Sequence, residues 1–98
     1  MKIRFTQSGG FMGLVLSYRI DTTALEVRER ETVERLVIAA GLEESCECVS
    51  ETARDAVTYE IVIERTTQVR VVFDEIRLPD AVRPLVAYLK VRARPGGV

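Results

Sequence analysis

Histidine and tryptophan are absent from this 98-residue sequence, and only two cysteines and three prolines are present. Without an imidazole, no serine or cysteine nucleophile can be activated by a histidine base, and the commonest zinc ligand is missing. No apolar run approaches the ~20 residues that a membrane-spanning helix needs. The sequence therefore predicts a protein that is not an enzyme, with no catalytic residue, no bound metal and no cofactor.

Charge is abundant but balanced. The chain has 14 Lys and Arg against 15 Asp and Glu, which leaves a net charge of −1. Such a balance provides no electrostatic footprint for nucleic acid or for an anionic membrane surface. We expect one domain over residues 1–92 with a frayed tail over 93–98, monomeric when free. We expect it in the cytoplasm, because the alternating N-terminus does not look like a signal peptide.

Two alternating segments near the N-terminus predict a β-hairpin. Ile3 and Phe5 alternate with charged or polar residues, as in a strand with one buried face. The second segment places four apolar side chains on one face: Leu14, Leu16, Tyr18 and Ile20. The connection over residues 8–13 contains three glycines and is longer than the tightest hairpin turn, so it should project as a loop.

A helix is predicted over residues 27–40. Its apolar stripe has helical spacing and consists of Val33, Leu36, Val37 and Ala40. Gly41 follows the last periodic residue, where a left-handed cap needs a residue without Cβ. Residues 43–56 show no period and are acidic, which predicts a long loop that is either functional or disordered.

A second hairpin and a second helix are predicted after this loop. The hairpin's buried side chains are Val57, Tyr59, Ile61 and Ile63 on one strand and Val69, Val71 and Phe73 on the other. The helix stripe consists of Val82, Leu85, Val86 and Leu89. Pro79 and Asp80 mark its expected start, with a break and restart at Pro84. The whole is a ββαββα arrangement of class α+β, with a four-stranded, mostly antiparallel sheet and two helices on one face.

Reactive groups are few. Cys46 and Cys48 form a Cys-x-Cys pair, which lacks the spacing of redox and zinc motifs and has no second pair to complete four ligands. We expect two free thiols in a loop. The carboxylates of the same segment are Glu43, Glu44, Glu47, Glu51 and Asp55, and a solvated acidic loop explains them better than a paired acid and base, which need a water-poor cleft.

The glycine-rich connection is the best candidate for a binding site. It lacks the Gly-Lys-Ser/Thr ending of a phosphate loop and leads into a strand, so phosphate binding is disfavoured. Its glycines can simply serve a turn, and Phe11 could tuck onto the core. Two large apolar residues between glycines are also typical of an exposed anchor. The candidate partner-binding residues are Ser8, Gly9, Gly10, Phe11, Met12, Gly13 and Leu14.

Four segments resemble the emfourin family in the right order along the chain. They are MKIRFTQSGGF at 1–11, ERLVIAAG at 34–41, YEIVIE at 59–64 and LPDAVRPLVAYL at 78–89. Emfourins are small protein inhibitors of protealysin and related thermolysin-like zinc metallopeptidases. Segment 43–56, with two cysteines and no proline, departs from the family pattern, as does Tyr88 where tryptophan is common.

The resemblance implies that the chain inhibits a thermolysin-like metallopeptidase. Such enzymes have a catalytic zinc and an apolar pocket for the residue after the scissile bond, which Phe11 or Met12 would suit. A rival placement puts segment 43–56 in the cleft, with Cys46, Cys48 or a carboxylate on the peptidase zinc. The alternative from another class is a small interaction or regulatory module that binds a different protein.

Overall fold

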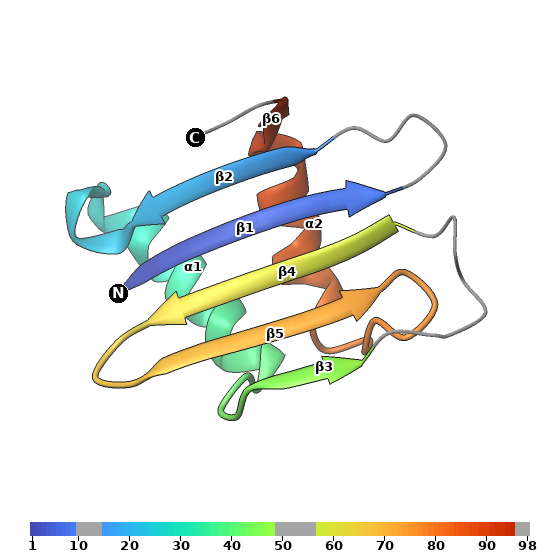
Figure 1. The fold of residues 1–98 in the computed structure, drawn as a ribbon. Helices are drawn as coiled ribbons and strands as arrows, with labels where there is room; N and C mark the ends of the chain where they lie inside the picture. Colours follow the sequence, from blue (N-terminus) through green and yellow to red (C-terminus); the bar gives the residue numbers. More distant parts are fainter. Residues whose placement is uncertain (10–14, 49–56, 96–98) are drawn as a thin grey trace.

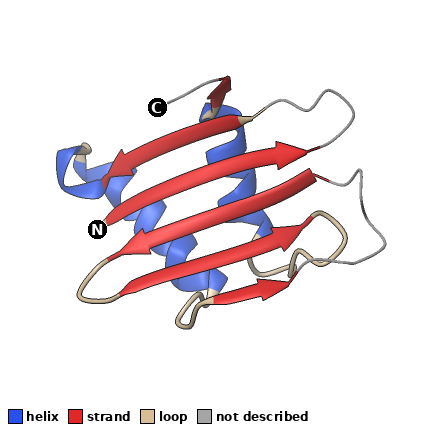
Figure 2. Cartoon of the chain, in the orientation of Figure 1, coloured by secondary structure: helices blue, strands red, loops and turns tan. Residues whose placement is uncertain are grey.

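The computed structural model describes residues 1–9, 15–48 and 57–95. In chain order, the elements are β1 (Lys2–Gly9), β2 (Leu16–Asp21), the 3-10 turn η1 (Thr22–Ala24), α1 (Val27–Ala40), β3 (Cys46–Cys48), β4 (Val57–Glu64), β5 (Gln68–Asp74), α2 (Arg83–Arg92) and β6 (Arg94–Pro95). They form one sheet with the strand order β3-β5-β4-β1-β2-β6. Both helices cover the same face of this sheet, and the other face is open (Figures 1 and 2).

The α+β class and the placement of both helices on one face agree with the sequence prediction, but the sheet is larger than predicted. It is a six-stranded mixed sheet and not a four-stranded one, and the ββαββα order is incomplete. Cys46–Cys48 forms β3, which pairs parallel with β5 through residues 71–73. Arg94 and Pro95 form β6 against Leu16 and Ser17, where a frayed tail was expected.

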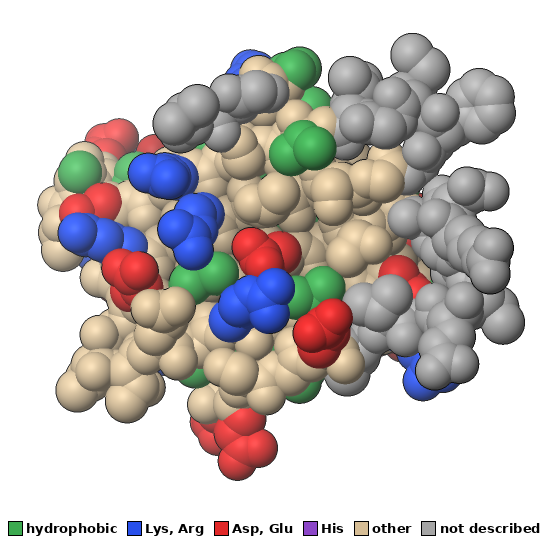
Figure 3. Space-filling model, in the orientation of Figure 1, with side chains coloured by type: hydrophobic (Ala, Val, Ile, Leu, Met, Phe, Trp, Pro, Cys, Tyr) green, Lys and Arg blue, Asp and Glu red, His purple; other side chains and the backbone are tan. Residues whose placement is uncertain are grey.

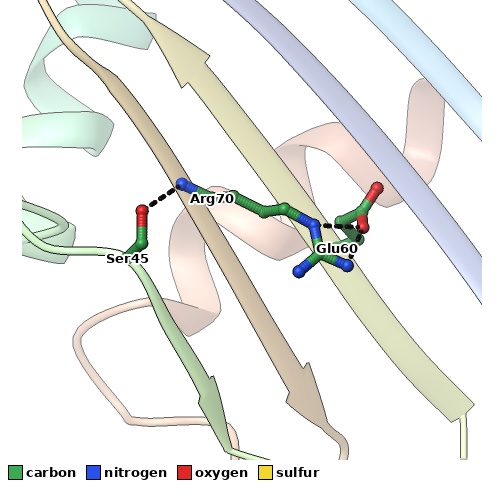
Figure 4. Close-up of polar contacts among 3 residues, drawn as sticks. All are labelled: Ser45, Glu60 and Arg70. Atoms are coloured by element: carbon green, nitrogen blue, oxygen red, sulfur yellow. Dashed lines mark hydrogen bonds and ion pairs between the residues drawn. The ribbon is translucent and has the colours of Figure 1, made fainter.

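Both missed strands are very short. β3 has three residues and β6 has two. An alternating pattern needs about four residues or more before it can be told from chance. Ser45 helps to hold β3 in place, because its Oγ accepts a hydrogen bond from the backbone N–H of Arg70 on β5 at 3.0 Å (Figure 4).

The core lies between the sheet and the two helices. β1 is central and pairs antiparallel with β2 on one side and β4 on the other. The described residues among those predicted to alternate in the two hairpins supply the sheet side, and Phe5 stacks on Tyr59 with ring centroids 6.0 Å apart. The fully or nearly buried apolar residues of the two helices are Val33, Val37 and Ala40 on α1 and Leu85, Val86 and Leu89 on α2.

The helix boundaries follow from local chemistry. α1 has the predicted bounds and ends at Gly41, whose φ of 64° is left-handed. α2 begins later than predicted, at Arg83 and not at Pro79. The N–H groups of Val82 and Arg83 instead donate to the carbonyls of Pro79 and Asp80, in tight turns. Pro84 has no N–H to continue this series, so it occupies the first turn of α2, which confirms the predicted restart.

The described part of the chain contains no helix with the length and apolar character needed to cross a membrane.

Candidate functional site

One end of the sheet collects the features that the sequence analysis singled out. β1 ends there at Gly9, β2 begins there after Val15, and β4 begins there at Val57 (Figure 1). Gly9 lies opposite Val57 in the β1–β4 pair, and Gln7 lies opposite Leu16 in the β1–β2 pair. We call this region the strand-end surface and define it by Ser8, Gly9, Val15, Val57 and residues 75–77.

Of the predicted partner-binding residues, Ser8 and Gly9 are described. Ser8 is half-buried opposite Thr58, and Gly9 is exposed with a left-handed φ of 85°. A side chain at that φ would be strained, so a glycine is required where the chain leaves β1. Gly10, Phe11, Met12, Gly13 and Leu14 lie outside the described residues.

The strand β3, which belongs to the alternative segment 43–56, ends at the same end of the sheet. Cys48, the last residue of β3, lies opposite Phe73, and Phe73 also lies opposite Tyr59 near the start of β4. The chain therefore leaves β3 and re-enters β4 at the end where it leaves β1 and re-enters β2. Residues 49–56 lie outside the described residues. Of their two attachment points, Val57 lies opposite Gly9, whereas Cys48 is on the edge strand β3.

A rigid turn with an exposed apolar tip stands beside these attachment points, and the sequence analysis missed it. Ile76 lies in the turn between β5 and α2 with 67% of its surface exposed. On one side of it, the N–H of Glu75 donates to the carbonyl of Val57 at 3.0 Å. On the other side, the N–H of Arg77 donates to Oδ1 of Asp74 at 2.6 Å.

Asp74 is the anchor of this turn. Its residue surface is completely buried, so its side chain must be hydrogen-bonded to offset the loss of hydration. An Asp that binds an N–H a few residues later is a common turn signal, and D-x-x-R alone is too frequent to have indicated a site. The turn holds Ile76 away from the core although isoleucine is among the most buried residue types.

Val15 adds a second exposed apolar side chain at this end, with 50% of its surface accessible. Val15 precedes β2, whereas Ile76 follows β5, so the strands β1 and β4 lie between them. At about 4.8 Å per strand, the two side chains are separated by roughly 14 Å. Val15 and Ile76 thus mark the two ends of the strand-end surface.

The thiol prediction is corrected in one respect. Cys46 carries an exposed thiol and not a disulfide, as predicted, but it lies on strand β3 opposite Val71 and not in a loop. Among the residues that the structure describes, no three Cys, Asp or Glu side chains gather closely enough to hold a metal ion. The described carboxyl groups of the predicted acidic segment, Glu43, Glu44 and Glu47, are exposed.

Comparison with known proteins gives one match. A family model described as Emfourin matches residues 5–90, which is most of the chain. No curated protein and no solved structure matches it. The match covers the strand-end surface from Ser8 to Arg77.

Proposed function

The chain belongs to the emfourin family, an inhibitor family, and we propose that it inhibits a thermolysin-like zinc metallopeptidase through its strand-end surface. In this proposal, residues 8–14 enter the active-site cleft and Phe11 or Met12 fills the apolar pocket beside the zinc. The observation that carries the proposal is the family match, because it covers the segment that the residue types had already singled out.

The geometry around the segment supports this mode of inhibition. Its attachment points belong to β1 and β2, and β1 is hydrogen-bonded on both edges, to β2 and β4. A segment held at both ends by a sheet loses less conformational entropy on binding than a free peptide does. The same restraint can hold a carbonyl away from the orientation that hydrolysis needs, so the inhibitor would occupy the cleft without being cut.

Ile76 belongs to the proposed contact as well. An apolar side chain on a turn fixed by two hydrogen bonds can be buried against a partner at low entropic cost. A few well-packed side chains that lose all contact with water carry most of the binding energy of an interface. We therefore expect Ile76 to contact the peptidase surface beside the cleft.

Titration of a thermolysin-like peptidase with the purified protein tests the proposal. Residual hydrolysis of a fluorogenic peptide should fall in proportion to added protein until the two are equimolar. If the cleft is occupied, raising the substrate concentration should raise the apparent inhibition constant in proportion. An inhibition constant that does not change with substrate would place the contact elsewhere on the enzyme. No inhibition across several such peptidases would favour an interaction module with another partner.

A further inference from the structure

The open face of the sheet holds two arginines side by side. Arg4 on β1 and Arg19 on β2 lie directly opposite each other, and both are exposed. Neither guanidinium makes a hydrogen bond or an ion pair with any residue that the structure describes. Lys and Arg side chains accordingly gather over β1 and β2 on this face (Figure 3).

Such a pair is unfavourable by itself. Like charges directly opposite each other on adjacent strands destabilise a sheet. On the same face, the positive charge of Arg70 is paired with an opposite charge. Its guanidinium binds Glu60 across β4 and β5 at 2.7 and 2.8 Å (Figure 4). In the strand register, Val62 separates Arg4 from Arg70. One arginine on this face is therefore ion-paired, whereas the neighbouring two are not.

A hollow of about 340 Å³ lies at the two unpaired arginines. The nearly buried Val62 is part of its wall, and its charged lining residues are Lys2, Arg4, Arg19, Asp21 and Glu64. The two carboxylates belong to the Lys2 end, because Lys2 lies opposite Asp21 on one side and Glu64 on the other. Oδ1 of Asp21 also accepts hydrogen bonds from the hydroxyl and the N–H of Thr23. The three cations and two carboxylates leave this lining with a net charge of +1, and Arg4 and Arg19 are the two cations at the end away from Lys2.

We propose that Arg4 and Arg19 bind a phosphate-class dianion in this hollow. Guanidinium groups match the oxygens of a phosphate bidentately, and a dianion neutralises both of them. A hollow of this volume is large enough for a small phosphate monoester. The distance from Arg4 to Gly9 along β1 is about 16 Å, so this site is separate from the strand-end surface and does not depend on the proposed inhibition.

NMR titration of the full chain with inorganic phosphate and with phenyl phosphate, near pH 8 and at constant ionic strength, tests the proposal. We expect saturable amide shifts centred on β1 and β2. The variants Arg4→Gln and Arg19→Gln should each weaken binding about tenfold, the loss expected for one charge-assisted contact. The matched control is Arg70→Gln, on the same face but paired with Glu60, and it should bind within about twofold of the parent.

Each outcome decides the question. Tighter binding of phenyl phosphate would assign the site to an organic phosphate, and equal binding would assign it to free phosphate. Shifts that do not saturate, or that chloride reproduces at equal ionic strength, would overturn the proposal, as would an equal loss in Arg70→Gln. Thermal melts guard against misfolding. Because like-charge repulsion is removed, Arg4→Gln and Arg19→Gln should melt no lower than the parent without phosphate.

Discussion

The side chain of Asp74 and the backbone N–H of Arg77 are joined by a 2.6 Å hydrogen bond that closes the turn carrying Ile76. The acceptor is buried and the tip of the turn is exposed. A completely buried polar residue thus serves to fix an exposed apolar one. The consequence is that the stability of this turn and the strength of the proposed inhibition can be tested separately.

The first prediction concerns Ile76→Asp. Placing a charge on the apolar tip should raise the inhibition constant about 10- to 100-fold, because the aspartate would be desolvated against the partner without a matching charge. The matched control is Ile38→Asp on α1. Ile38 is 76% exposed and lines a hollow with Met1 and Arg65, at the other end of the sheet. Equal effects of both substitutions on inhibition would remove Ile76 from the contact.

The second prediction concerns Asp74. Asp74→Ala removes a completely buried carboxyl group and leaves the N–H of Arg77 without its acceptor, and it should lower the free energy of unfolding by about 1–3 kcal/mol. Asp74→Asn keeps a side-chain oxygen and should cost less than Asp74→Ala. Chemical denaturation of the three proteins measures the difference. If the alanine variant were as stable as the parent, the hydrogen bond would not anchor the turn.

The third prediction concerns Phe11→Ala. If Phe11 fills the apolar pocket of the peptidase, its removal should weaken inhibition by ~2 kcal/mol or more, which is roughly a 30-fold rise in the inhibition constant. The thermal melt of the variant should match that of the parent. The same measurement on Met12→Ala tells which of the two side chains occupies the pocket. Unchanged inhibition by both variants would contradict the placement of residues 8–14 in the cleft.

The fourth prediction concerns Tyr88, which links the helices. Its hydroxyl donates to Oε1 of Glu29 on α1 at 2.9 Å, and the guanidinium of Arg92 lies 3.6 Å from its ring centroid. Tyr88→Phe keeps the ring and removes the hydrogen bond, so unfolding should become easier by about 1 kcal/mol. Glu29→Ala should add little to the Tyr88→Phe variant if both remove the same interaction. If the two losses of stability added fully, the two substitutions would not be removing the same hydrogen bond.

The environment of Tyr88 also leads us to expect a loss of stability at high pH. Burial and the hydrogen bond to Glu29 raise the pKa of Tyr88 above its ordinary value of 10.0, and Arg92 opposes the shift. Because the folded state holds this proton more tightly than the unfolded state, the contribution to stability is complete below pH 10 and is lost as pH rises through the folded pKa. Absorbance at 295 nm should show a late tyrosine titration step that is missing in Tyr88→Phe.

The fifth prediction concerns Asp21 at low pH. Hydrogen bonds from the hydroxyl and then the N–H of Thr23, with a smaller effect of Lys2, lower the pKa of Asp21 below its ordinary value of 3.8. A depressed folded pKa means that this contribution is present above pH 3.8 and is lost as pH falls below it. Asp21→Asn should therefore reduce the loss of stability between pH 4 and pH 2. An unchanged acid transition in this variant would contradict the assignment.

The regular elements could be predicted because their patterns are local. Ile3 and Phe5 repeat with the period of a strand, and Val33 and Val37 repeat with that of a helix. Each pattern extends over enough residues to be recognised, and Gly41 marks the end of α1 through its own left-handed φ. The same holds for the glycine at the end of β1, where Gly9 has positive φ.

The sequence by itself therefore determined the α+β class, the two hairpins, the bounds of α1 and the glycine at the end of β1. Only the tertiary structure decided that β1 and β4 are neighbours, that β3 and β6 extend the sheet, that Ile76 is presented outward, and that Arg4 and Arg19 face each other. The physical reason is range. Periodicity is a property of consecutive residues, whereas strand order and cross-strand neighbours depend on contacts between distant parts of the chain, which no local pattern records.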